Sequence, residues 1–181
     1  MTPTETLKHE HQIVLLVLKG AGREARSSKK NGTSDITKVD QMLDFFKTFV
    51  DRCHHTKEER HLFPALERHS GSPKEAPIEV LLQEHEAGRQ RVKAIGEALP
   101  EARLGRPDAV AEICENLLAY VKLLRSHIEK EDKFLFPFAE KVLTRKEQAA
   151  LEDAFEKVEA EEMGEGVHEK YHQLAHDLAE G

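Results

Sequence analysis

The chain of 181 residues contains one series of polar and apolar residues twice, and this repeat limits the folds open to it. Each copy has a Glu-His pair, a second histidine 42 or 43 residues later, a glutamate four residues beyond it and a Leu-Phe-Pro sequence. The first copy comprises Glu10, His11, His54, Glu58 and Leu62-Phe63-Pro64, and the second comprises Glu84, His85, His127, Glu131 and Leu135-Phe136-Pro137. Two similar helical hairpins would explain this pattern.

Apolar residues recur with helical spacing along nearly the whole chain, and Leu, Ala, Glu and Lys are abundant. We therefore expect an all-α fold: an up-down four-helix bundle with a pseudo-twofold internal repeat, plus one or two C-terminal helices. The polar segment 27–35 should be a loop, and Pro64 should kink or end the second helix. A single domain over 1–181 would then comprise a first hairpin at 1–70, a second at 77–143 and a helical tail at 144–181.

Overall composition argues against several function classes. The formal net charge of −7 disfavours electrostatic binding to nucleic acid. The longest apolar run, Ile13 to Leu18, is too short to span a membrane, and the N-terminus lacks the features of a signal peptide. Two cysteines do not make a disulfide framework, so we expect a cytoplasmic protein.

Histidine and glutamate four residues apart lie on the same face of a helix. In both copies this pair continues an apolar stripe, so the side chains should point into the bundle. In each antiparallel hairpin, the histidine of the first helix should lie at a similar level to the histidine of the second helix, within about 5 Å along the helix axis. The residues expected to converge are His11, His54 and Glu58 in the first hairpin and His85, His127 and Glu131 in the second.

Buried imidazoles and carboxylates are costly when unpaired, whereas a metal ion would bind both groups. Without thiolates, this donor set suits iron, manganese or zinc. We expect two metal ions, one per hairpin, bridged by Glu58 and Glu131. A single His-x-x-x-Glu sequence is more often a solvated pair, but two copies in register favour the metal site.

Several polar neighbours fall outside this expected site. Glu59, Asp132 and Lys57 are interpreted as solvated residues beside the ligands. His55 is excluded because it aligns with Ile128 in the second copy. In contrast, His61 shares a helix face with His54, and it is interpreted as a pocket residue or an alternative ligand.

These motifs resemble those of the hemerythrin-like, or HHE cation-binding, family over residues 4–143. The resemblance implies an up-down four-helix bundle with a non-haem di-iron centre and O₂-related chemistry. It also implies five histidines and two carboxylates, including a His-x-x-x-His pair on the third helix. Here Leu81 and Arg89 occupy the positions four residues from His85. We expect His168 in the tail to supply the missing ligand, with Tyr171 nearby; a solvated amphipathic tail helix is the alternative.

The resemblance predicts a protein with two non-haem iron ions that binds or reacts with O₂, peroxide or NO, with manganese or zinc as possible substitutes. A small diatomic or peroxide ligand is the expected partner. Two alternatives remain open: an iron or redox sensor that acts without turnover, and a bundle stabilised by structural zinc. Carriage and turnover need the same ligands, so the sequence leaves that choice open.

Overall fold

Helices form all of the regular structure of this protein, which we describe over residues 1–181 from a computed structural model. The predicted all-α class is confirmed, because the chain contains no strand. The elements are α1 (Pro3–Asn31), α2 (Ile36–Phe45), η1 (Phe46–His55), η2 (Glu58–Leu62), α3 (Phe63–Glu67), α4 (Ile78–Arg103), α5 (Pro107–Lys130), η3 (Glu131–Leu135), α6 (Phe136–Val142), α7 (Arg145–Glu162) and α8 (Val167–Glu180), where η denotes a π-helix.

Local sequence signals explain most of the helix ends. Thr144 caps α7 in a capping box with Glu147, as the sequence predicts, and Asp35 accepts a hydrogen bond from the backbone of the first turn of α2. The loop predicted to begin at residue 27 begins later, because α1 continues to Asn31. Gly32 ends α1 in the left-handed conformation, with φ of 74°, which glycine adopts without strain.

The Leu-Phe-Pro sequences lie at the ends of π-helical turns rather than at the ends of helices. The amide of Phe63 donates to the carbonyl of Glu58, five residues earlier, and α3 then continues through Pro64. The second copy repeats this arrangement, with α6 following η3 through Pro137. We attribute the continuation to the wider π turn, which relieves the clash that proline causes in an α-helix. Both repeats thus place a π turn directly after a histidine–glutamate pair.

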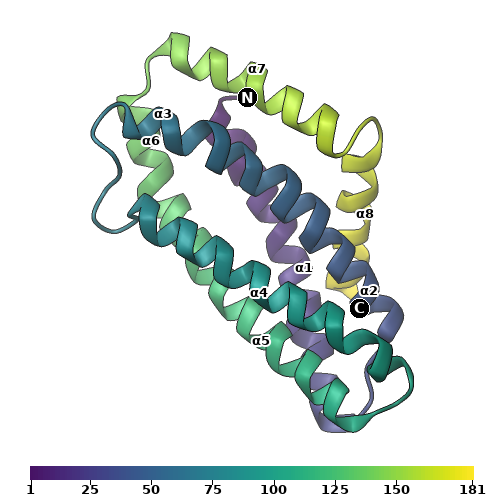
Figure 1. Ribbon diagram of the computed structural model, residues 1–181. Helices are drawn as coiled ribbons and strands as arrows, with labels where there is room; N and C mark the ends of the chain where they lie inside the picture. Colours follow the sequence, from purple (N-terminus) through teal and green to yellow (C-terminus); the bar gives the residue numbers. More distant parts are fainter.

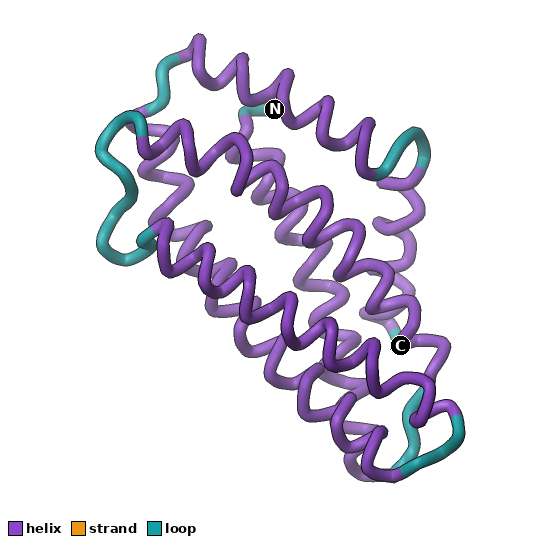
Figure 2. The backbone as a smooth tube through the Cα atoms, viewed as in Figure 1, coloured by secondary structure: helices purple, strands orange, loops and turns teal.

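The long helices lie side by side, and the tail helices α7 and α8 lie on the outside of this group (Figure 1). Helix α5 packs against both α4 and α1, while α8 packs against α1. Helix α7 contacts η1 and η2, so the tail covers the first half of the chain near the π-helical segments. The loops that join the long helices lie at the two ends of the group, whereas the loop between α7 and α8 lies on its side (Figure 2).

The apolar core is divided into two clusters, of 33 and 14 buried residues. Along α1, Leu7 belongs to the smaller cluster and Val14 to the larger, with the buried His11 between them. The same order recurs around His85 on α4. A layer of buried histidines and glutamates therefore separates the two apolar clusters, and this layer contains the candidate site.

Two further findings concern the apolar character of the helices and the state of the cysteines. None of the helices combines the length and the apolar character needed to cross a bilayer. Both cysteines, Cys53 and Cys114, are buried and unbonded. Burial raises the pKa of the Cys53 thiol to about 12, so this residue is a packed apolar side chain rather than a reactive thiolate.

Candidate metal centre

Seven buried side chains form two overlapping groups in the polar layer. Within each group, the potential ligand atoms all lie within 4.8 Å of one another. The first group comprises His11, His54, Glu58 and Glu131, and the second comprises His55, Glu58, His85 and His127. Glu58 belongs to both groups, so a donor of one group is also available to the other. The structure brings together six of the seven residues predicted as ligands and adds His55.

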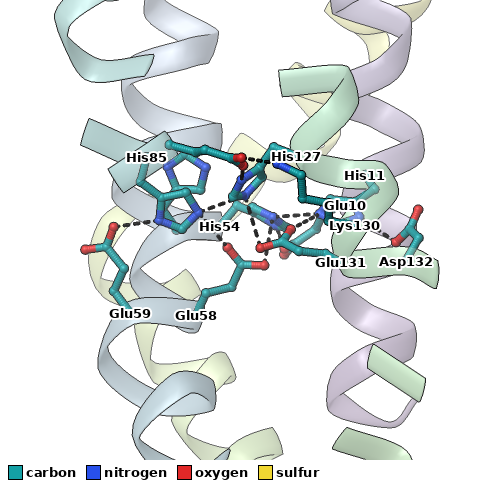
Figure 3. A network of polar contacts seen from close by, with 12 residues as sticks. Glu10, His11, His54, Glu58, Glu59, His85, His127, Lys130, Glu131 and Asp132 are labelled. Carbon is teal, nitrogen blue, oxygen red and sulfur yellow. Dashed lines mark hydrogen bonds and ion pairs between the residues drawn. The ribbon is translucent and has the colours of Figure 1, made fainter. Parts of the chain in front are cut away.

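Glu58 lies between the two groups of histidines, with its side chain fully buried. Its Oε1 atom is 3.4 Å from Nε2 of His54 in the first group. Its Oε2 atom is 3.4 Å from Nε2 of His85 in the second group. One carboxylate thus presents one oxygen to each group, which is the disposition needed to bridge two cations (Figure 3).

Glu131 repeats this arrangement from the other half of the chain, again with a fully buried side chain. Its Oε2 atom is 3.2 Å from Nε2 of His11, and its Oε1 atom is 3.0 Å from Nε2 of His127. Both glutamates therefore span the two histidine groups. The internal repeat of the sequence appears here as a pair of equivalent carboxylates in one layer.

Each of the five histidines has a carboxylate partner at its Nδ1 atom. The pairs are His11 with Asp132 (2.7 Å), His54 with Glu10 (2.7 Å), His55 with Asp51 (3.3 Å), His85 with Glu59 (2.7 Å) and His127 with Glu84 (2.8 Å). We assign the imidazole proton to Nδ1 from these partners. Such partners orient metal-binding imidazoles and leave the Nε2 lone pair free.

The inward-facing atoms of this layer are mostly acceptors without donors. The Nε2 atoms of His11 and His54 are 3.1 Å apart, and those of His85 and His127 are 2.9 Å apart. In the neutral imidazoles that metal binding requires, the proton is on Nδ1, and neither member of a pair can then donate to the other. The four carboxylate oxygens of Glu58 and Glu131 also lack hydrogen-bond partners. Cations would satisfy all these atoms at once, so the donor set fits metal binding.

The carboxylates that contact Nδ1 of the histidines, and the lysines paired with them, follow the same twofold pattern as the ligands. Lys57 pairs with Glu10, and the equivalent Lys130 pairs with Glu84. The interpretation of Lys57, Glu59 and Asp132 as solvated neighbours is wrong: Lys57 is fully buried, and the other two hold imidazoles. Their matched spacing in the two copies was the signal that could have identified this role.

His55 is the ligand candidate that sequence comparison of the two copies missed. It lies next to His54, and neighbouring residues of an α-helix point about 100° apart. Both are nonetheless buried, because they lie at the end of the π-helix η1, where the turn is wider. The His55 ring stacks on His85 with centroids 3.7 Å apart. Its counterpart Ile128 lies in the regular helix α5, so the repeat is asymmetric here.

Arg89 occupies one of the two positions on α4, four residues from His85, where the family resemblance implies a second histidine. Its guanidinium donates to Oδ1 of Asp51 at 2.8 Å and to Oε1 of Glu59 at 2.6 Å. Those two carboxylates are the partners of His55 and His85. Arg89 therefore supports both imidazoles from outside, while His55 places a fifth imidazole in the layer from the neighbouring helix.

His168, the predicted tail ligand, lies outside both groups. Its Nδ1 atom is 3.2 Å from Oε1 of Glu159, whose other oxygen is 3.3 Å from Nζ of Lys57. Contact with His168 lowers the pKa of Glu159 to about 2, although partial burial opposes this, and Glu159 raises the pKa of His168. The tail thus reaches the layer through a chain of ion pairs ending at Glu10, and adds no donor.

Two other sequence candidates also lie away from the layer. His61 is partly exposed and belongs to neither group of potential ligands. The hydroxyl of Tyr171 donates to Asp44 at 2.8 Å, on the outer side of α2. The helix α8 therefore packs against the bundle through residues such as Tyr171 rather than closing the polar layer.

The electrostatics of the metal-free layer are set by the two central glutamates. Burial and the charge of Glu131 raise the pKa of Glu58 well above its usual range. Glu131 shows the reverse: its pKa is well below the usual range, because the charge of His127 outweighs burial. Although burial opposes it, the charge of Glu131 raises the pKa of His127 to about 9. Metal binding must displace the protons that Glu58 and His127 hold.

Comparison with known proteins agrees with this geometry. The model of the hemerythrin HHE cation-binding domain matches residues 2–139. The chain belongs to this family. The matched segment includes all seven residues of the layer and ends before the tail helices. A buried cluster of histidines and glutamates in a hemerythrin HHE domain marks the chain as a metal-binding domain.

Individual relatives of this hemerythrin HHE domain are distant. The chain is 24% identical over 165 residues to the uncharacterized proteins Mb2018 of Mycobacterium bovis and Rv1995 of Mycobacterium tuberculosis. These matches cover 91% of the chain but 64% of each relative, so the chain spans about two thirds of their length. No solved structure matches the chain significantly.

With His55 included, the layer offers five histidines and two glutamates. This is the number of ligands that the hemerythrin resemblance implies, but one imidazole comes from a different helix. The departure at Arg89 is thus compensated within the bundle.

Proposed function

We propose that the seven residues hold two non-haem iron ions and that this centre binds or reduces a small oxidant such as O₂, peroxide or NO. One observation carries the proposal: two groups of buried donors share carboxylates, and every imidazole is held with Nε2 facing inward. Imidazole and carboxylate donors without thiolates suit iron, while manganese and zinc are the expected substitutes.

The two ions have different ligand sets in this proposal. His11 and His54 would hold one ion, while His55, His85 and His127 would hold the other, and both would share Glu58 and Glu131. The first group offers one histidine fewer, so it would leave more room for a small oxidant. Bound iron supplies the electrons and the open coordination position for this chemistry.

Other residues keep the centre dry and fix its protons. Phe136 stacks on the His11 ring with centroids 5.3 Å apart, and Phe63 stacks on His85 at 5.9 Å. These rings limit the access of water, so a small uncharged molecule enters more readily than an ion. The outer carboxylates hold the Nδ1 protons and keep the imidazoles oriented.

The wider architecture of the proposal follows the sequence repeat. We interpret the helices as an up-down four-helix bundle built from hairpins at 1–70 and 77–143. The tail at 144–181 then covers its first half. The contacts of α7 with η1 and η2 support this arrangement.

A regulatory role without turnover is the second candidate. The ion pairs from His168 through Glu159 and Lys57 to Glu10 connect the tail to the partner of His54. A change in the charge of the centre would change the strength of these ion pairs. Such a sensor would bind iron and change the packing of its tail, but would not consume the oxidant.

The optical spectrum of anaerobically reduced, iron-loaded protein tests the proposal. Adding O₂ should produce ligand-to-metal charge-transfer bands, with metal analysis of the same sample showing iron. Regeneration of the reduced spectrum by removal of O₂ indicates carriage, and lasting oxidation indicates reduction of O₂. Protein that contains zinc but no iron after growth with sufficient iron would contradict the proposal.

A further inference from the structure

A cavity of about 470 Å³ lies beside the metal centre, between the first hairpin and α4. Its walls include Phe46, Asp51 and His55 on one side and Gly88, Val92 and Gly96 on the other, with Tyr120 from α5. The volume is in the range of pockets that bind small organic molecules. His55 is the only one of the seven candidate ligands in this wall.

Two glycines on α4 line this cavity. Gly88 and Gly96 are eight residues apart, which corresponds to about 12 Å along a helix. A Cβ atom at Gly96 would have one neighbour within 4 Å, Nζ of Lys47 at 3.8 Å. Close packing therefore does not require glycine there, although glycine inside a helix costs about 1 kcal/mol relative to alanine. The space above Gly96 is thus maintained at a cost to the stability of α4.

The floor of the cavity is apolar and aromatic, with two rings tilted by 47° to one another. The rings of Phe46 and Tyr120 pack with centroids 4.5 Å apart, and Val92 lies beside them in the wall. Both rings are buried beneath the cavity. Such a floor suits an aromatic group, because its ring would gain burial and favourable edge or face contacts with the two rings.

The charges around the cavity leave one cation free. Asp51 is paired with Arg89, and Glu97 lies 3.9 Å from Lys93 in an exposed pair. Both carboxylates of the wall therefore have a cationic neighbour. The ammonium of Lys47 lies over Gly96 and pairs with neither of them. The end of the cavity away from His55 thus presents an uncompensated positive charge.

We propose that this cavity binds a small organic anion with a flat apolar body, whose anionic group lies at Lys47 and whose apolar end lies against His55. Binding depends on the cavity alone. The effect on the centre rests on the proposed function, because the bound molecule would contact the imidazole that stacks on His85 and shift the spectrum of the neighbouring iron.

Binding of 2-naphthoate to zinc-loaded protein tests the proposal by fluorescence anisotropy. Two changes should each weaken binding by about tenfold or more, equivalent to about 1.4 kcal/mol: Gly96→Leu, which fills the cavity, and Lys47→Glu, which reverses its free charge. The matched controls, Ala87→Leu on the exposed side of α4 and Lys122→Glu on α5, should leave the dissociation constant unchanged. The uncharged 2-naphthamide should bind about tenfold more weakly than 2-naphthoate.

The outcomes separate this proposal from the proposed function. Binding to zinc-loaded protein that weakens in the two cavity variants supports the site, even if iron-loaded protein fails to react with O₂. No binding at millimolar 2-naphthoate, or equal binding by cavity variants and controls, overturns it. Lys47 is exposed, so Lys47→Glu remains a valid test if Gly96→Leu does not fold. In iron-loaded protein, 2-naphthoate at the wild-type dissociation constant should shift the charge-transfer bands clearly in wild type and much less in Lys47→Glu.

Discussion

Replacing Glu58 or Glu131 by glutamine should affect the metal-free protein very differently, although the two residues occupy equivalent positions. Burial and the charge of Glu131 favour the protonated form of Glu58, and an amide closely matches a protonated acid in shape and charge. Glu58→Gln should therefore change the free energy of unfolding of metal-free protein by less than about 1 kcal/mol.

Glu131→Gln should destabilise the metal-free protein strongly. Glu131 is fully buried, and it lies 3.2 Å from His11 and 3.0 Å from His127. Removing one partner from a buried ion pair leaves the other charge uncompensated and costs about 3–5 kcal/mol. The difference between the two variants should therefore be at least about 2 kcal/mol in favour of Glu58→Gln.

Glu58→Gln, which should change the stability of metal-free protein little, should clearly lower the stability of metal-loaded protein. A ligand present at 100 times its dissociation constant stabilises the folded state by about 2.7 kcal/mol, and a bridging amide would forfeit much of this gain. Urea unfolding of chelator-treated and metal-loaded protein measures both effects. Equal destabilisation of the two metal-free variants would refute the electrostatic argument. Undiminished metal stabilisation of Glu58→Gln would refute its role as a bridge.

Three further predictions follow from the geometry. Loading metal-free protein with metal at neutral pH should release protons from Glu58 and His127, because the pKa values of both groups are raised. The measured enthalpy of metal binding should therefore depend on the buffer, and the metal affinity should fall as pH falls. Equal binding enthalpies in phosphate and Tris would contradict this prediction. His55→Ala should loosen one ion selectively, giving two metal-binding phases in a chelator competition where wild type holds both ions; wild-type affinity for both would remove His55 from the site. His168→Ala should retain both ions and lose up to about 1 kcal/mol of stability, since its partner is about one-third exposed. The pKa of His168 is raised in the folded protein, so the destabilisation by His168→Ala should be largest below pH 6.5, the pKa of His168 in the unfolded chain. It should disappear as pH rises through the pKa of the folded protein. A destabilisation that does not change with pH would refute the ion pair with Glu159.

Sequence reasoning succeeded where the structure repeats and failed where the two halves differ. Spacing at i and i+4 was sufficient to place His54 with Glu58 and His127 with Glu131 on buried faces, because this inference needs helical periodicity alone. The same reliance on symmetry excluded His55. Its inward orientation depends on a π-helix, which apolar periodicity does not reveal.

The tail shows a second limit of sequence reasoning. The sequence favours His168 as the fifth histidine because the glycines at 164 and 166 permit a reversal of the chain. The reversal does occur, but the helix after it docks through apolar residues and an ion pair with Glu159. Which of several histidines reaches a buried layer depends on long-range packing, and local sequence carries little information about that.

The most direct test of a two-metal centre is an anaerobic titration of metal-free protein with Fe²⁺, followed by removal of unbound iron and metal analysis. Two groups of donors that share Glu58 predict saturation at two iron ions per chain, with magnetic coupling between them after oxidation. Saturation at one iron ion per chain, or two ions that remain magnetically independent, would contradict the account.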